Sequence, residues 1–343
     1  MANSYFMGGT SAKGFQTKFS DIINKPGYFT YILKGGPGTG KSTLMKKVLK
    51  HFSDSDNDLY YCSSDISSLD AVVIHDQKAI VVDGTSPHIF NPVYPGISQT
   101  LVDLGSCWDR SKLINKEREI LRCFKENAAY HRRAKCYVTA LTGINDSIYD
   151  QASAALNLDE LSRIAEELSS FLPDNSSPGS CNYQQLSAIT SAGYFTERPS
   201  ANVFALNDPY YAAGSIILGM LKNLLVKKGQ DIVISECHMF SNPLTEHIYI
   251  PQRKLLISHV NPLNKLDYEI SLDCTSFYSI LNTEELCRSQ DFALSLEKET
   301  AYSIGYALDI HDDLESYYID ALNFDSLNLL TEELIESISA QAV

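Results

Sequence analysis

The sequence predicts an α/β protein built from two similar halves, each of which closes with a long helical hairpin. An apolar stretch at 29–33 precedes a glycine-rich segment and then an amphipathic helical pattern, which is typical of a parallel sheet covered by helices. The segment 155–168 recurs at 321–334, with eight of fourteen residues identical, whereas unrelated segments would share roughly one. Two proline-free stretches, at about 110–171 and 281–339, predict the helical arms.

A linker separates the predicted halves. The segment 173–182 contains proline, glycine and small polar residues and lies near the midpoint of the chain. We therefore expect one domain over 1–172 and a second over 183–343. The repeat also relates 69–87 to 244–262 without a gap, and each of these segments predicts two strands joined by a tight turn.

Composition excludes several classes of protein. The chain has 343 residues with 28 Lys and Arg against 42 Asp and Glu, so its net charge of 28 − 42 = −14 argues against non-specific nucleic-acid binding. No apolar stretch approaches the roughly 20 residues that span a bilayer, and 1–14 lacks a basic segment followed by an apolar one, so we expect a cytoplasmic protein without a membrane partner. The eight cysteines contain no C-x-x-C pair, which excludes a zinc knuckle.

The segment from Gly35 to Thr43 matches the pattern G-x-x-x-x-G-K-[ST] between the predicted strand and helix. Glycines let successive backbone N–H groups converge on a phosphate at a helix N-terminus, where the helix dipole favours an anion. We expect Lys41 to reach the β- and γ-phosphates and Ser42 to offer its hydroxyl to Mg²⁺. A glycine turn that only joins strand to helix is the alternative. The predicted nucleotide-binding residues are Gly36, Pro37, Gly38, Thr39, Gly40, Lys41, Ser42 and Thr43.

A second metal-binding group is expected at the end of a neighbouring buried strand. The run 79–82 is entirely apolar and ends at Asp83, which we interpret as the Walker B carboxylate that binds Mg²⁺ together with Ser42. An aspartate that only begins the turn Asp83-Gly84 is the alternative. No glutamate follows Asp83, so the neighbouring base of many motor-type ATPases is missing.

Asp65 completes the predicted catalytic set of Lys41, Asp83 and Asp65. It follows the predicted strand 59–62, at a place where small-molecule kinases often hold the acceptor. A turn-capping role for Asp65 is an equally reasonable interpretation. His88 could approach the same edge of the sheet, although a lone histidine is more often structural.

The second half has lost the charged residues of this site. When the first half is aligned with the second along the repeat, Ala213 stands at the position of Lys41, and Ser258 corresponds to Asp83. The bulky Tyr210 would also obstruct a phosphate. We therefore predict a degenerate second site that serves packing, partner binding or completion of the first site, and one nucleotide per chain.

Over essentially its whole length the chain resembles an uncharacterised bacterial family of tandem P-loop ATPase-like proteins. The resemblance implies a P-loop NTPase core with a helical hairpin insertion, duplicated in tandem, that uses ATP and Mg²⁺. In that family the second half keeps its own phosphate loop, and this chain departs from the pattern at Ala213 and Ser258. The segments that carry the resemblance are 8–15, 34–43, 62–65, 68–70 and 83–88.

Three functional hypotheses follow. The leading one is slow, Mg²⁺-dependent ATP hydrolysis at a single N-terminal site that drives a conformational switch of the helical arms. The first alternative is a small-molecule kinase that transfers the γ-phosphoryl group to an acceptor near Asp65 or His88. The second is a non-catalytic nucleotide-binding module. The helical arms and the C-terminal half are the predicted surfaces for a protein partner.

Overall fold

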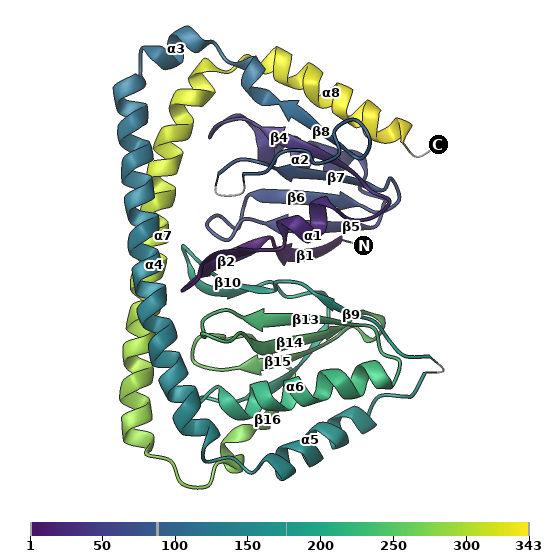
Figure 1. Cartoon of the computed structure of the whole chain (residues 1–343), viewed down its shortest axis with the longest axis vertical. Helices are drawn as coiled ribbons and strands as arrows, with labels where there is room; N and C mark the ends of the chain where they lie inside the picture. Colours follow the sequence, from purple (N-terminus) through teal and green to yellow (C-terminus); the bar gives the residue numbers. More distant parts are fainter. Residues whose placement is uncertain (1, 87–88, 176, 342–343) are drawn as a thin grey trace. The chain divides into compact units, whose positions relative to one another are not determined.

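The chain is an α/β protein with two mixed six-stranded sheets (Figure 1). The structure is a computed structural model, and it describes residues 2–86, 89–175 and 177–341. The chain forms two compact units. Unit 1 comprises Met1–Gly8, Phe15–Arg133 and Tyr302–Val343, and unit 2 comprises Gly9–Gly14 and Ala134–Ala301.

The sheet of unit 1 has the strand order β1-β5-β6-β7-β4-β8. β4 lies between β7 and β8 and is parallel to both, whereas β5, β6 and β7 are successively antiparallel and β1 is parallel to β5. The strands are β1 (Ala2–Phe6), β4 (Phe29–Lys34), β5 (Asn57–Tyr61), β6 (Leu69–Ile74), β7 (Ala79–Asp83) and β8 (Gln99–Asp103). The stretch of chain between β1 and α1 forms a separate two-stranded sheet of β2 (Gly8–Ser11) and β3 (Gly14–Thr17), and residues Gly9–Gly14 of this stretch belong to unit 2.

Helices α2 and α8 supply the helical side of the core of unit 1. α2 packs against β6 and β7, and α8 packs on α2. The helices of this unit are α1 (Phe19–Ile23), α2 (Lys41–His51), the 3₁₀ helix η1 (Leu104–Cys107), α3 (Arg110–Ile114), the first part of α4 (Glu117–Ser153), the last part of α7 (Thr283–Ala321) and α8 (Phe324–Ala340). The buried core residues include Leu33, Leu44, Met45, Val48, Val72, Ile74, Val81, Leu327, Leu334 and Ile338.

Unit 2 contains the second sheet, in the order β16-β12-β15-β14-β13-β9. Its strands are β9 (Cys181–Tyr183), β12 (Asn202–Asn207), β13 (Ile232–Cys237), β14 (Leu244–Ile250), β15 (Leu255–Val260) and β16 (Ile270–Asp273), beside a hairpin of β10 (Ser187–Thr190) and β11 (Gly193–Thr196). The helices are the rest of α4 and α7, α5 (Leu158–Ser170), α6 (Ala212–Lys227) and the 3₁₀ helices η2 (Pro251–Arg253) and η3 (Cys274–Phe277). α6 packs on β14, and α5 covers α6.

The two sheets share one pattern of strand pairing. Counted from its other edge, the second sheet reads β9-β13-β14-β15-β12-β16. Its parallel and antiparallel pairs fall at the same places as in β1-β5-β6-β7-β4-β8. In each unit the strand that leads into the first long helix, β4 or β12, is therefore flanked by two parallel neighbours.

Register identifies which residues occupy equivalent places in the two sheets. Asp103 at the end of β8 pairs with Lys34, and its carboxylate caps η1 by accepting the N–H two residues further on. Asp273 at the end of β16 pairs with Asn207 and caps η3 in the same way. Lys34 and Asn207 therefore end their strands at equivalent positions.

The same comparison locates the counterpart of Asp83. Asp83 pairs with Leu33 on β4, and the residue that pairs with Leu206 on β12 is His259. The prediction that Ser258 corresponds to Asp83 is wrong by one position. The predicted alignment is one residue out from its start, because the bulge residue of β6 is Asp70 and its counterpart in β14 is Glu246, 176 positions further on.

The compact units differ from the predicted domains 1–172 and 183–343. The chain passes from unit 1 to unit 2 within α4 and returns within α7, and the predicted linker 173–182 lies inside unit 2. The units differ from the predicted domains because the last helix of each half of the sequence packs in the unit that contains the sheet of the other half. α5, from the first half of the sequence, packs on α6 in unit 2, whereas α8, from the second half, packs on α2 in unit 1.

The repeated A-L-N-x-D segment has the same local role in both halves. The Asn157 side chain caps α5 by accepting the N–H groups of Asp159 and Glu160, and Asn323 caps α8 by accepting the N–H of Ser326. Within the described residues, none of the helices combines the length and the apolar character that crossing a membrane requires.

Candidate functional site

The loop from Gly35 to Gly40 joins β4 to α2 in unit 1. Gly38 (φ +66°) and Gly40 (φ +78°) both adopt left-handed backbone conformations, which side chains with a Cβ disfavour. A Cβ on Gly38 would also lie 2.6 Å from the backbone oxygen of Glu315. The buried Thr39 fastens the loop from inside, because its hydroxyl donates to the carbonyl oxygen of Gly36 (2.8 Å).

Lys41 is the first residue of α2, and its ammonium group faces back into the loop. Its Nζ donates to the carbonyl oxygens of Gly35 (3.2 Å) and Gly36 (2.9 Å). It also lies 3.7 Å from Oδ2 of Asp83. The two predicted charged residues therefore meet at the carboxyl ends of β4 and β7, which are parallel neighbours.

Asp83 both begins a turn and faces the ammonium group of Lys41. Its Oδ1 accepts hydrogen bonds from the N–H (2.8 Å) and the hydroxyl (2.6 Å) of Thr85, so it does begin a turn. Its Oδ2 faces Lys41. Ser42 lies beside Lys41 in the first turn of α2, where its Oγ accepts the N–H of Leu69 (3.1 Å). Of the two predicted Mg²⁺ ligands, Ser42 therefore places a hydroxyl oxygen at the N-terminus of α2, and Asp83 places a carboxylate oxygen at the end of β7.

The other two predicted nucleotide-binding residues lie within the loop and shortly after it. Pro37 is half-buried within it, and Thr43 is exposed in the first turn of α2. Lys34, directly before the loop, directs its Nζ to the carbonyl oxygens of Gly84 and Phe90, both at 2.6 Å. Lys34 therefore fastens the segment that follows β7.

Asp70 is a buried acid near this site that the sequence prediction did not include as a site residue. A β-bulge makes it the extra residue of β6, since Tyr60 pairs with Ala71 and Tyr61 with Leu69. Burial and then the negative charge of Asp83 raise the pKa of Asp70 to about 8, although Lys41 opposes the shift. The sequence signal that could have identified Asp70 is an acidic residue within the otherwise apolar run of β6.

Asp65 is engaged in a turn. Its Oδ1 accepts the N–H of Ser67 (2.9 Å), and its Oδ2 accepts the hydroxyl of Ser68 (2.5 Å). Burial alone would raise the pKa of Asp65, but the hydrogen bonds from Ser68 and Ser67 outweigh it and hold the pKa below its usual range. This geometry agrees with the turn-capping alternative. His88 lies outside the described residues.

The C-terminal part of α7 supplies a carboxylate to the loop. Oε1 of Glu315 accepts the N–H of Gly38 at 3.0 Å and lies 3.4 Å from Nε2 of His311. The hydrogen bond from His311 is the largest cause that lowers the pKa of Glu315. Burial raises this pKa, whereas the hydrogen bond from the Gly38 N–H and the charge of Lys41 lower it further. Sequence reasoning missed Glu315 because 277 positions separate it from Gly38.

Two aromatic rings pack against the loop on the side of β8. A Cβ on Gly36 would lie 3.2 Å from the ring of Tyr318 and 3.3 Å from that of Trp108. The two ring centroids are 5.2 Å apart. These side chains line a shallow surface pocket together with Arg110 and Leu113. The glycine at position 36 therefore permits a close approach between the loop and these rings.

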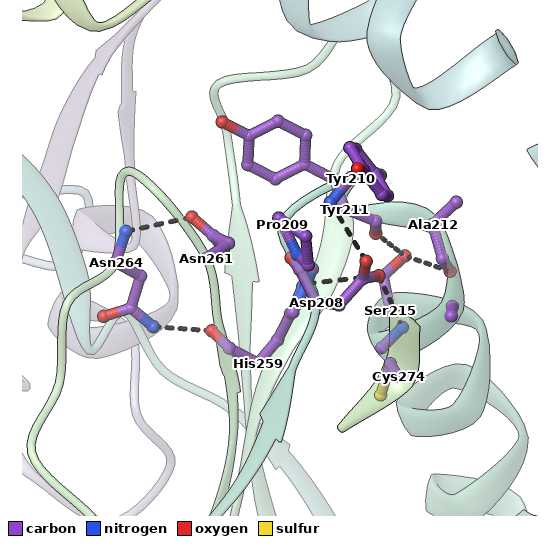
Figure 2. A network of polar contacts seen from close by, with 12 residues as sticks. Asp208, Pro209, Tyr210, Tyr211, Ala212, Ser215, His259, Asn261, Asn264 and Cys274 are labelled. Carbon is purple, nitrogen blue, oxygen red and sulfur yellow. Dashed lines mark hydrogen bonds and ion pairs between the residues drawn. The ribbon is translucent and has the colours of Figure 1, made fainter. Parts of the chain in front are cut away.

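The corresponding loop of unit 2 already holds a carboxylate of the chain (Figure 2). Asp208 is fully buried; its Oδ1 accepts the N–H of Tyr210 (3.0 Å), and its Oδ2 accepts the N–H of Gly214 (2.9 Å). The hydroxyl of Tyr278 donates to the same carboxylate, at 2.8 Å from Oδ1 and 3.0 Å from Oδ2. Nε2 of His259 lies 3.7 Å from Oδ2.

The acidic and the basic residue exchange places between the two loops. In unit 1 the cation, Lys41, starts the helix and the carboxylate, Asp83, ends the strand. In unit 2 the carboxylate, Asp208, starts the loop and an imidazole, His259, ends the strand. Burial, outweighing the charge of Asp208, lowers the pKa of His259. No lysine or arginine occurs from 208 to 215.

The position assigned to Ala213 also differs slightly from the prediction. α6 begins at Ala212, so Ala213 is its second residue, whereas Lys41 is the first residue of α2. The left-handed residue before α6 is Tyr211 (φ +68°), whose buried ring packs against Phe240. The second loop is therefore filled by its own side chains.

Comparisons of the chain with protein-family models, with curated proteins and with solved structures find no match. The interpretation of the site therefore depends on its own geometry.

Proposed function

We propose that unit 1 is a P-loop NTPase core that binds one ATP with Mg²⁺ at the loop from Gly35 to Thr43. The observation that carries the proposal is the meeting of Lys41 and Asp83, 3.7 Å apart, at the helix end of a loop with two left-handed glycines. A loop that exposes backbone N–H groups at a helix N-terminus favours a phosphate. A lysine and an aspartate at that place fit a phosphate and its Mg²⁺ respectively.

The proposal also makes unit 2 a degenerate tandem copy. The shared order of strand pairing and the equivalent caps at Asp103 and Asp273 support a duplication. The buried Asp208 supports the loss of the second nucleotide site, because a carboxylate on the loop N–H groups leaves them no free donor for a phosphate.

The residues of unit 1 have distinct roles in this proposal. The N–H groups of the loop and Lys41 would hold the β- and γ-phosphates, and Ser42 and Asp83 would hold the metal ion. The bound Mg²⁺ would neutralise charge that develops on the phosphates. The absence of a glutamate beside Asp83 supports slow hydrolysis.

Among reactions, we favour hydrolysis over transfer to an acceptor. The Asp65 carboxylate, the predicted acceptor-binding group, is occupied by Ser67 and Ser68. Nucleotide-dependent movement of α4 and α7 in the cytoplasm, acting on a protein partner, completes the proposed function. A kinase and a non-catalytic module stay the alternatives that the experiment separates.

The experiment incubates the protein with γ-labelled ATP and Mg²⁺, with and without a metabolite mixture. We expect free phosphate to appear without any acceptor. Asp83→Asn removes the charge that faces the metal and should slow release by about tenfold or more, with a smaller effect on nucleotide binding.

Exposed Asp54 provides the matched control, since Asp54→Asn removes one charge away from the loop and should leave the rate unchanged. Label that appears on a metabolite would establish the kinase instead. Bound ATP that never turns over would establish the non-catalytic module.

A further inference from the structure

Glu315 occupies a hydrogen-bond donor that a bound phosphate would need. The N–H of Gly38 lies in the middle of the phosphate loop and donates to Oε1 of Glu315 at 3.0 Å. His311, one helical turn earlier on α7, supports the carboxylate from 3.4 Å. The backbone of α7 is also close, because a Cβ on Gly38 would lie 2.6 Å from the Glu315 carbonyl oxygen.

A phosphate and this carboxylate would compete for the same place. One N–H makes one strong hydrogen bond, and a charged acceptor makes it stronger than a neutral one does. Two anions near one donor also repel each other, and the repulsion is larger at a partly buried site than in water. Glu315 is half-buried.

In the second loop a carboxylate likewise accepts loop N–H groups, but there the carboxylate is fully buried. Asp208 is fully buried and accepts hydrogen bonds from two backbone N–H groups and from Tyr278. Glu315 accepts only one loop N–H, and it comes from the surface-accessible face of a long helix rather than from the loop itself. Fewer hydrogen bonds therefore hold the Glu315 carboxylate to its loop than hold that of Asp208.

We propose that Glu315 is a displaceable internal anion that closes the phosphate loop of unit 1, and that nucleotide binds by displacing it. This regulation rests on the proposed function, since it concerns the same nucleotide site. The carboxylate opposes binding, and the displacement frees the C-terminal part of α7 from the loop. Glu315 is thus a link between occupancy of the site and the position of α7.

The test measures the dissociation constant of ATP with Mg²⁺ for the intact protein and for Glu315→Gln. The amide keeps the shape of the side chain but removes its charge, so we expect affinity to increase by about tenfold. Glu315→Ala, which removes the competing acceptor altogether, should increase affinity at least as much. Asp313→Asn is the matched control, because Asp313 is exposed on the same helix, and its affinity should equal that of the wild type.

Each outcome decides the inference. Tighter binding by both Glu315 variants, or binding that becomes detectable only in them, supports it, provided that Lys41→Ala in the Glu315→Gln background abolishes binding. Unchanged or weaker binding by the Glu315 variants, with a wild type that binds ATP, overturns this inference and leaves the proposed function standing. Absence of binding in the wild type and in both variants overturns both.

Discussion

Buried and half-buried carboxylates set the electrostatics of both loops. In unit 1, Asp83 faces the Lys41 ammonium group and Glu315 accepts the N–H of Gly38, whereas in unit 2 Asp208 takes the loop N–H groups itself. A helix N-terminus attracts an anion wherever its N–H groups are free. The two loops therefore differ in the carboxylate that accepts their N–H groups. Only the loop of unit 1 is followed by a lysine, Lys41, that could pair with a phosphate.

Asp70 makes a residue-level prediction about stability and pH. Its pKa is about 8 in the folded protein, whereas an unfolded aspartate titrates near its ordinary value of about 4. Between these values the folded state holds a proton that the unfolded state releases, so this group lowers the free energy of unfolding as pH rises from about 4 to about 8. Asp70→Asn abolishes the titration, and the variant should gain stability relative to the wild type as pH rises through this window.

Urea denaturation at several pH values between 5 and 8.5 measures this difference. Asp54→Asn, at an exposed position, is the control and should follow the wild-type curve at every pH. Parallel curves for Asp70→Asn and the wild type would show that Asp70 is already ionised in the folded protein.

At the scale of elements, α8 completes the core of unit 1. Leu334 is 4% exposed and belongs to the same buried cluster as Leu44 and Val48 of α2. Leu334→Ala should therefore lower the free energy of unfolding by about 2–5 kcal/mol. Leu329 lies on the same helix at 58% exposure, so Leu329→Ala should change stability by less than about 0.5 kcal/mol.

Denaturation of both leucine variants checks this packing. Equal effects at the two positions would mean that α8 does not cover α2. A large effect at Leu334 alone would support the placement of this C-terminal helix on the N-terminal sheet.

Local patterns predicted most elements of the first core. The strands at 29–34 and 79–83 and the helix that begins at Lys41 have strong apolar periodicity and clear ends, because glycines or polar turns bound them. The sequence did not reveal which helix covers which sheet. The apolar stripe of α5 or of α8 shows which face of the helix is buried, but it does not show which helix covers that face. From the sequence alone, either helix could therefore pack on α2 or on α6.

Register was a further limit of sequence reasoning. Lys78 and Lys254 both have positive φ values, 49° and 46°, at the end of the turn before β7 and β15. The backbone therefore equates these two lysines, whereas identities such as Gln77 with Gln252 shift the alignment by one residue. Successive residues of a strand point to opposite faces of the sheet, so a shift of one residue matters. It led to Ser258 instead of His259 as the predicted counterpart of Asp83 in the second sheet.

At the scale of the whole molecule, each unit is assembled from separate stretches of chain. α7 supplies Gln290, which donates to the carbonyl oxygen of Pro209 in the loop of unit 2, and Glu315, which accepts from Gly38 in the loop of unit 1. One helix thus contributes a side chain to each loop. The candidate site was predictable where its residues are adjacent in sequence, as at Gly35–Ser42, and unpredictable where long-range folding brings in α7.

The central claim is that one loop of this chain holds one nucleotide. Calorimetric titration of the intact chain with ATP and Mg²⁺ tests it most directly, together with the variant Lys41→Ala. We predict one nucleotide bound per chain in the wild type and no measurable binding once the lysine is lost. Two nucleotides per chain, or undiminished binding by Lys41→Ala, would contradict the account.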